Sequence, residues 1–242
     1  LRVYFLINKF QKNQNKLLDL WWIFGMSLWF YGYSNPVYLL LILASIGTNF
    51  FITKKITLNR KKEKISVAKK WMISGVLFNL ALIFYFKYYD FFIGNMNVLF
   101  QEDWNLKHLA LPLGISFFTF QQISYVVDCY REKVFVEYRF IEYAAYVAFF
   151  PQLVAGPIVR AKDFLPQIHK PTLVTRQMMG HALFLILIGL IKKAIISDYI
   201  SINYVDRIFD APLLYSGSEN LMGVYGYALQ IYCDFSGYSD MA

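Results

Sequence analysis

Residues 20–53 read LWWIFGMSLWFYGYSNPVYLLLILASIGTNFFIT and contain no charged side chain. A helix that crosses a bilayer needs about 20 apolar residues, so this stretch is too long for one span. The turn-forming sequence Gly-Tyr-Ser-Asn-Pro at 32–36 divides it and predicts two helices, over 18–32 and 36–53. Tryptophan and tyrosine side chains flank the turn, as is typical of a membrane interface.

Five further uncharged runs follow, at 71–86, 109–127, 143–159, 177–191 and 220–233. The chain is 57% apolar and only 17% charged, whereas soluble domains are about 45–50% apolar and about 25% charged. This composition excludes a disordered chain, a coiled coil and an ordinary soluble domain. With two cysteines, the chain also cannot build a disulfide framework. The fold class predicted is therefore all-α, a polytopic transmembrane protein.

The net charge of +8 is concentrated in two basic segments. Residues 1–16 carry four basic side chains and no acid. Residues 54–70 carry one acid, Glu63, against eight basic side chains: Lys54, Lys55, Arg60, Lys61, Lys62, Lys64, Lys69 and Lys70. Because 54–70 lies between two apolar runs, the positive-inside rule explains it better than nucleic-acid binding does. We expect no nucleic-acid partner, and we place 1–16 and the loop 54–70 in the cytoplasm.

Alternating the runs across the membrane puts 87–108 outside and Arg131, Lys133 and Arg139 inside. A crossing fifth run would then leave the basic residues that follow it on the outer side, against the same rule. Pro151 and the Gly156-Pro157 pair would break a helix in this run. We therefore predict that run five enters the membrane and turns back beside a water-filled cavity. A kinked crossing helix that breaks the charge rule once is the alternative.

Three stretches place polar residues where lipid is expected. The first is Leu111–Gln122, in which Ser116, Thr119 and Gln122 share one helical face. The second surrounds run five and contains Pro151, Gln152, Gly156 and Pro157. The third is residues 230–240, with Asp234, Ser236, Gly237, Tyr238 and Ser239. Interhelical hydrogen bonding is the simpler interpretation of these residues, and the lining of a tunnel for substrate is the functional one.

Two basic residues directly follow run five. Arg160 and Lys162 could attract the phosphates of a cytosolic donor. Ordinary positive flanking of a membrane segment is the alternative. No soluble-enzyme motif of the serine-hydrolase, zinc-protease or P-loop type occurs, and no metal site is expected.

Read together, LPLGISFFTFQ..SY..D.YR, FFPQLVAGPIVR..DFLPQ and QIYCDFSGYSDMA resemble the membrane-bound O-acyltransferase family, in its alginate O-acetyltransferase branch. The stretch Gly189–Lys193 with Asp198 is similar to that branch as well. The resemblance covers about 111–242, which would hold the family's core motifs, whereas 1–110 fits only in hydropathy. We expect 1–242 to form a single membrane domain.

The resemblance implies broken and re-entrant helices arranged around a central tunnel. It also implies an enzyme that passes an acyl group, typically acetyl, from a cytosolic donor to an extracytoplasmic polysaccharide such as an alginate-like polymer or peptidoglycan. The donor would be acetyl-CoA, and a secreted acetyltransferase or another polysaccharide-modifying protein would be a partner. The protein would lie in the cytoplasmic membrane.

The family's catalytic histidine follows the DFSGYSD stretch, so the resemblance puts it beyond residue 242. None of His108, His169 and His181 occupies a matching position. We therefore expect a fragment truncated at both ends, without its general base or acyl-relay group.

Two alternatives stay open. D-alanyl transferases of teichoic acid are similar in outline, but they carry Ser-Gly-Pro-Ile and Ala-Gly-Tyr-Ser where this chain has Ala155–Ile158 and Ser236–Ser239. A transporter or a non-catalytic scaffold for polysaccharide export would also use broken helices. A transporter predicts an inverted repeat, and none is visible between 1–110 and 111–242.

Overall fold

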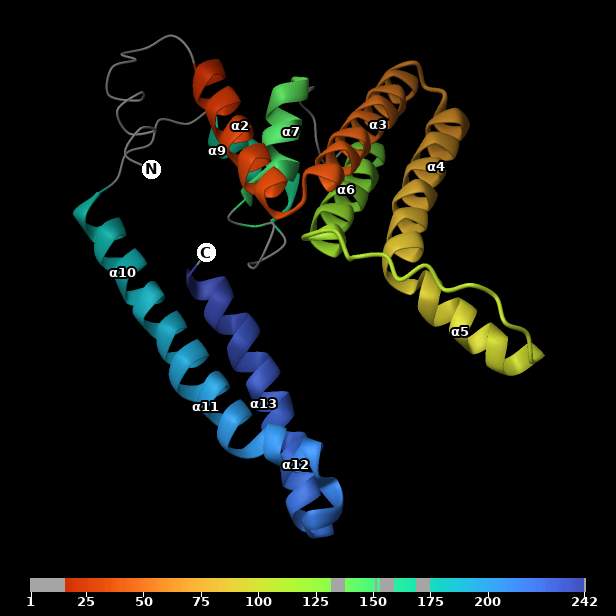
Figure 1. Cartoon of the computed structure of the whole chain (residues 1–242). Helices are drawn as coiled ribbons and strands as arrows, with labels where there is room; N and C mark the ends of the chain where they lie inside the picture. Colours follow the sequence, from red (N-terminus) through yellow and green to blue (C-terminus); the bar gives the residue numbers. More distant parts are fainter. Residues whose placement is uncertain (1–15, 132–137, 151, 153–158, 169–174, 242) are drawn as a thin grey trace. The chain divides into compact units, whose positions relative to one another are not determined.

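A computed structural model describes residues 16–131, 138–150, 152, 159–168 and 175–241. These residues form helices and no β-strand (Figure 1), as the predicted all-α class requires. They belong to two compact units. Unit 1 contains residues 1–154 and 158–170, and unit 2 contains residues 155–157 and 171–242. Each unit is described by itself, and the single membrane domain stays a prediction.

In unit 1, the turn at 32–36 separates helices α2 (Lys16–Ser34) and α3 (Pro36–Lys61) as predicted. The side chain of Asn35 accepts a hydrogen bond from the backbone N–H of Val37, and Pro36 takes the first helical position. The predicted end of the second helix at residue 53 is wrong. Lysine and arginine favour helix as well as most apolar residues do, so charge does not end α3 when the apolar run stops.

The predicted basic loop 54–70 is therefore mostly helix. α3 ends at Lys61 and α4 (Ile65–Ile83) starts after a turn of three residues. The predicted outer loop 87–108 also contains helix, because α4 continues through the π-helix η1 (Phe84–Tyr88) into α5 (Tyr89–Phe100). The chain then returns along α5. The carboxylate of Asp90 accepts the backbone N–H groups of Lys107 and His108.

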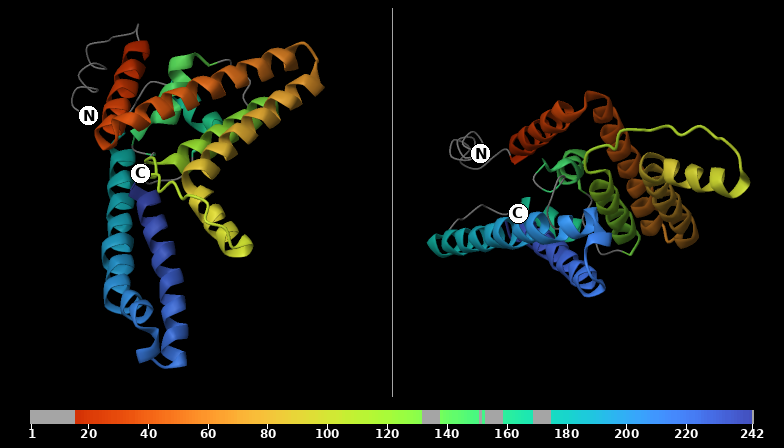
Figure 2. Two further views of the ribbon diagram at one scale, coloured as in Figure 1. Left: turned by 45° about the vertical axis from the view of Figure 1, so that its right-hand side comes forward. Right: turned by 60° about the horizontal axis from the view of Figure 1, so that its bottom comes forward.

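Helix α6 (Ile115–Tyr130) packs against both α3 and α4 (Figures 1 and 2). It begins six residues later than the start of the predicted run at 109, after Pro112 and the left-handed Gly114. Gly75 allows the close packing of the three helices, since a Cβ there would lie 3.1 Å from Ile52 and 3.1 Å from Val126. The fully buried amides of Asn49 and Asn79 bond to each other between α3 and α4.

The ends of these helices fix their directions. Arg60, near the end of α3, lies over the ring of Tyr130 at the end of α6. At the opposite end, the Tyr38 hydroxyl donates to the backbone carbonyl of Ala110, just before α6. Helices α3 and α6 therefore run parallel, and their basic ends lie on one side of unit 1.

Run five is a short broken helix. α7 (Phe140–Ala148) is about 13 Å long, less than half of a bilayer core. It packs among α2, α3, α6 and α9 (Ala161–Ile168), and residues 141–148 are all buried. Its start contacts Phe50 near the middle of α3, and Phe150 beyond its end contacts Phe30 of α2. The chain is thus not an unbroken rod here, and residues 141–148 do not face the surroundings of unit 1.

The chain also turns back after α7. The Tyr146 hydroxyl donates to the backbone carbonyl of Val159 at 2.8 Å, although 13 residues of straight helix would separate the two by about 20 Å. The ring of Phe164 in α9 packs on both Tyr146 and Phe149. The described parts of run five therefore do not form one straight helix, and the predicted turning back within the membrane stays a prediction. The predicted breaking residues Pro151, Gly156 and Pro157 lie outside the described residues, and the tunnel stays a prediction.

In unit 2, one long helical rod pairs antiparallel with α13 (Gly217–Met241). The rod comprises α10 (Arg176–Leu190), η2 (Ile191–Ser197), α11 (Asp198–Ile200), η3 (Ser201–Val205) and α12 (Asp206–Asp210). The 3-10 turn η4 (Pro212–Leu214) leads toward α13, which starts with a capping box. There the backbone and hydroxyl of Ser216 donate to Glu219, and these bonds lower the pKa of the Glu219 carboxyl.

The predicted spans 177–191 and 220–233 do not pair with each other. Gly189 meets Gly237, and Ile208 meets Gly223. Residues 220–233 therefore lie beside 195–210, not beside 177–191. The predicted end at 191 is wrong because the following charges, Lys192 and Lys193, are paired with carboxylates and the helix continues. Among the described residues, three helical stretches are long and apolar enough to cross a membrane: Pro36–Lys61, Ile65–Phe100 and Arg176–Asp210.

Candidate functional site

The predicted polar face of α6 points into the interior of unit 1. Thr119 and Gln122 are fully buried and Tyr125 is almost so. The Gln122 amide nitrogen donates to the hydroxyl of Ser45 at 3.0 Å, and its oxygen accepts from the Tyr143 hydroxyl at 3.3 Å. These bonds tie α6 to α3 and to α7. A buried polar network of this kind holds its helices in one arrangement.

A second amide pair links α6 to the segment that turns back. The Gln121 amide nitrogen donates to Oε1 of Gln152 at 3.3 Å. On the other side of the segment, the backbone N–H of Phe150 donates to the hydroxyl of Ser27 in α2. The reversal after α7 is therefore fixed from two neighbouring helices by side-chain hydrogen bonds, since a chain that leaves its helix must find new partners for its backbone groups.

The structure brings together only some of the residues predicted for unit 1. Gln122 and Gln152 belong to these two networks, which start from the adjacent residues Gln122 and Gln121 of α6. The buried hydroxyl of Thr119 has no hydrogen-bond partner among the described residues, and Ser116 is partly exposed one turn earlier. Arg160 and Lys162 are exposed at the start of α9, and no ion pair joins them to another described residue.

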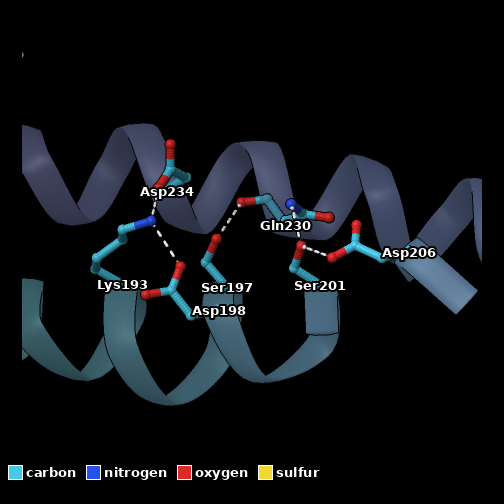
Figure 3. Close-up of polar contacts among 7 residues, drawn as sticks. All are labelled: Lys193, Ser197, Asp198, Ser201, Asp206, Gln230 and Asp234. Atoms are coloured by element: carbon cyan, nitrogen blue, oxygen red, sulfur yellow. Dashed lines mark hydrogen bonds and ion pairs between the residues drawn. The ribbon is translucent and has the colours of Figure 1, made fainter. Parts of the chain in front are cut away.

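Unit 2 carries a line of polar contacts along its hairpin (Figure 3). The ammonium of Lys193 lies 2.6 Å from a carboxylate oxygen of Asp198 and 2.6 Å from one of Asp234. One turn further, the hydroxyl of Ser197 donates to the backbone carbonyl of Gln230. The Gln230 amide in turn donates to Ser201. We call this line the polar seam.

The seam continues toward the end of α13 through Lys192. Its ammonium lies 2.6 Å from a carboxylate oxygen of Asp240 and 2.9 Å from the hydroxyl of Ser236. At the opposite end, Ser201 donates to the carboxylate of Asp206. Charged side chains in a membrane protein pair with one another and face the protein interior or water. The seam face of the hairpin is therefore its non-lipid face.

The two π-helices keep the seam on one side of the rod. Gly189, Lys193, Ser197, Ser201 and Val205 all contact α13, and each is four residues from the next. At about 100° per residue, an α-helix would turn this series by roughly 160° from first to last. A π-turn, closed by i→i+5 hydrogen bonds, holds more residues than an α-turn, so residues four apart stay closer to one face of the rod. Such π-segments are frequent at functional sites.

The residues predicted for unit 2 have distinct places. Asp234 and Ser236 belong to the seam, and Gly237 is the crossing point of the two helices. A Cβ on Gly237 would lie 2.8 Å from the carbonyl oxygen of Gly189, so only glycine fits there. The Tyr238 ring lies 5.5 Å from the Lys193 ammonium. The Ser239 hydroxyl has no partner among the described residues.

Several residues of the unit 1 networks and of the polar seam were not predicted as site residues: Ser45, Gln121, Tyr143, Ser197, Ser201 and Gln230. The sequence did carry a signal for Ser45, because Ser45, Asn49 and Thr53 recur every four residues in a mostly apolar run. Gln230 is the first residue of the third stretch, and its spacing alone predicts no role for it. The pairing of Lys193 with Asp234 was not predictable, since it depends on the register of two helices.

The described residues contain no group of three His, Cys, Asp or Glu side chains that could hold a metal ion. In the same part of the chain, neither His108 nor His181 uses its side chain in a hydrogen bond. The two networks thus supply positioning and electrostatics, and a general base is not assigned within them.

Comparison with known proteins gives several relatives, although no family model matches the chain. It is 34% identical to the peptidoglycan O-acetyltransferase of Helicobacter pylori, over 99% of this chain and 49% of that protein. It is 35% identical to the alginate O-acetylase AlgI of Pseudomonas aeruginosa, over 88% of this chain and 41% of that protein. The teichoic acid D-alanyltransferase of Bacillus subtilis matches at 28% over 54% of this chain and 33% of that protein. The chain spans about half the length of the curated relatives it matches.

Proposed function

Because the chain belongs to the membrane-bound O-acyltransferase family, in its alginate O-acetyltransferase-like branch, we propose that the whole protein transfers an acetyl group to an extracytoplasmic polysaccharide. The observation that carries this proposal is the 34% identity to a peptidoglycan O-acetyltransferase over nearly the whole chain. A second acetylating relative acts, by its name, on alginate. The acceptor is therefore an alginate-like polymer or peptidoglycan.

The chain is a membrane protein, with three helical stretches of spanning length and apolarity among its described residues. Its proposed place is the cytoplasmic membrane, which it crosses several times. The parallel directions of α3 and α6 support this topology, because they bring Arg60 and Tyr130, and with them the two basic connections, to the same side.

The acyl donor in this proposal is acetyl-CoA, which approaches from the cytosol. Arg160 and Lys162 are exposed and free of carboxylate partners among the described residues, so their charge is open to the phosphates of such a donor. The tunnel that connects the donor to the outside is proposed to pass the reversal after α7, where Gln121, Gln122 and Gln152 supply hydrogen-bonding groups. A secreted transferase is the proposed partner that completes the reaction.

D-alanyl transfer to teichoic acid is the second candidate, supported by the weaker match to the Bacillus subtilis protein. It differs from the first in the ester that it leaves on the polymer. A non-catalytic scaffold is the third candidate. In that case acetylation of the polymer should not depend on any single side chain of this protein.

Deletion of the full gene tests all three. We expect the loss of base-labile acetyl groups from peptidoglycan or exopolysaccharide, measured separately in the two polymers, and their return with the intact gene. A variant gene without the expected histidine downstream of residue 242 should not restore them. Loss of D-alanine esters in place of acetate would support the second candidate. Restoration by the histidine variant would support a scaffold.

In the full enzyme, Gly156→Leu should block the predicted turn and abolish acetylation, because leucine disfavours the backbone conformations that glycine permits. The comparison is Gly180→Leu in α10, where nothing lies within 4 Å of an added Cβ. Retained acetylation in the Gly156 variant would show that the turn is not needed.

A further inference from the structure

The connection between α3 and α4 carries the densest charge in the chain. Eight basic side chains stand against one acid, Glu63, over residues 54–70. Because α3 ends at Lys61 and α4 begins at Ile65, a turn of three residues gathers these charges from both helix ends. We call residues 54–70 the basic tip. Its exposed lysines that form no ion pair with a described residue are Lys54, Lys62, Lys64, Lys69 and Lys70.

An aromatic pair marks the level of the bilayer interface on this hairpin. The rings of Phe51 and Trp71 meet edge to face at 6.0 Å, and the Lys55 ammonium lies 5.2 Å from the Phe51 ring. Tryptophan and lysine side chains anchor helices at the headgroup level. The 26 residues of α3 are about 39 Å long, which exceeds the hydrocarbon core of about 30 Å. The basic tip therefore begins where the headgroups begin.

Apolar side chains stay exposed among the lysines of the tip. Leu58 is 45% exposed, Ile65 54% and Val67 40%. Alternation of exposed apolar and basic side chains suits the boundary between acyl chains and phosphates. A soluble anionic ligand would meet only the charges, whereas a lipid meets both kinds of side chain.

We propose that the basic tip binds the phosphates of anionic phospholipids. Clusters of four to eight basic residues directly beside a membrane helix attract such lipids, and the tip holds eight beside two helices. Lysine ammonium groups bind phosphate as point charges, so the tip needs no fixed geometry for one headgroup. The site is independent of the proposed acetyl transfer, and its lipid preference is a property of the membrane domain itself.

The test reconstitutes the full-length protein in vesicles of phosphatidylcholine with a minority of phosphatidylglycerol. The protein is then extracted in polymer-bounded discs, and the lipids around it are quantified by mass spectrometry. We expect enrichment of phosphatidylglycerol over the bulk vesicle. The variant Lys62→Gln/Lys64→Gln/Lys69→Gln should lose it, with a reduction in local affinity of up to about fivefold for each lysine.

Two control variants are needed. One tests whether the effect comes from the charge and not from a change of fold, and the other tests whether it is specific to the basic tip. The matched variant Lys62→Arg/Lys64→Arg/Lys69→Arg keeps the charge and should keep the enrichment. Arg207→Gln in α12 removes one exposed charge elsewhere and should change nothing. Enrichment that survives in the triple glutamine variant would overturn the proposal.

A third arm uses pure phosphatidylcholine vesicles and acetyl-CoA as the probe. Binding of acetyl-CoA should be the same in the wild type and in the triple glutamine variant. If the variant instead loses acetyl-CoA binding and the wild type shows no lipid enrichment, the tip is a donor site and not a lipid site.

Discussion

Lys193 shows how one residue can join two segments that the sequence keeps apart. Its ammonium lies between Asp198, five residues further along the same rod, and Asp234 of α13. The π-helical turn η2, which contains Lys193 and ends at Ser197, brings Asp198 within reach of Lys193, and the packing of α13 supplies Asp234. The side chains are about a quarter to nearly half exposed in unit 2, so solvent would weaken the pairs and a membrane would strengthen them.

Lys193→Met should therefore destabilise the hairpin by about 2 kcal/mol in a bilayer, because it leaves two carboxylates without their cation. Unfolding in bilayer discs measures this. Lys193→Arg should stay near the wild type, and Lys193→Asp combined with Asp234→Lys should recover part of the loss. A methionine variant as stable as the wild type would contradict the role given to these pairs.

Gly237 carries a prediction about packing. A Cβ there would meet the carbonyl oxygen of Gly189 at 2.8 Å and Lys193 at 3.2 Å. Gly237→Ala should push the helices apart and cost about 1–3 kcal/mol. The measurement is disulfide formation between cysteines placed at 197 and 230, which should become slower. Gly180→Ala in the same hairpin has open space and is the matched control; equal effects of the two would rule out the close approach.

At the scale of elements, α7 is the unusual helix of unit 1. Eight of its nine residues are buried, and it packs against α2, α3, α6 and α9. A helix of this length is marginal alone, so packing and the hydrogen bonds at its ends hold it. Glu142 contributes at the start by accepting the backbone N–H of Arg139.

The hydrogen bond from Tyr146 to Val159 closes the reversal, so Tyr146→Phe should loosen it. The loss should be about 1 kcal/mol, since the carbonyl of Val159 is left without this partner. Hydrogen exchange of the backbone N–H groups of α9 in bilayer discs should become faster. Tyr199→Phe in unit 2, where the ring is 66% exposed, should leave that exchange unchanged. If both variants behave alike, the bond does not stabilise the reversal.

At the scale of the whole molecule, charge predicts which connections face the cytoplasm. Residues 54–70 of unit 1, beyond the Phe51–Trp71 pair, carry eight basic side chains, and the connection 211–216 between α12 and α13 carries none. The positive-inside rule therefore predicts that the basic tip faces the cytoplasm and that the connection 211–216 faces outward.

A cysteine at Ser218 should react with an impermeant thiol reagent in intact cells, whereas a cysteine at Glu63 should react only after the cells are permeabilised. Both sites are exposed, and the native thiols of Cys129 and Cys233 are buried, so the new cysteines dominate the signal. The wild type serves as the background. Labelling of residue 218 only after permeabilisation would overturn the proposed topology of unit 2.

The sequence alone determined the class of the protein. Long uncharged runs separated by charged segments are typical of membrane helices, in which each backbone N–H and C=O group is bonded within the helix. The sequence also predicted the turn before Pro36 from its turn-forming residues. It predicted the break in run five because the prolines there, and the basic residues that follow, do not suit a simple crossing helix. Local patterns decided these features, since each depends on residues close together in the chain.

Tertiary structure alone decided the ends of helices and the partners of polar groups. Lys192 and Lys193 end an apolar run by hydropathy, but carboxylates of α13 neutralise them and the helix goes on. Gln122 could be assigned to a polar face from its spacing, yet its partners Ser45 and Tyr143 lie 77 and 21 residues away. Whether a charge or an amide is exposed or paired depends on which distant segment packs beside it, and spacing along one helix does not contain that information.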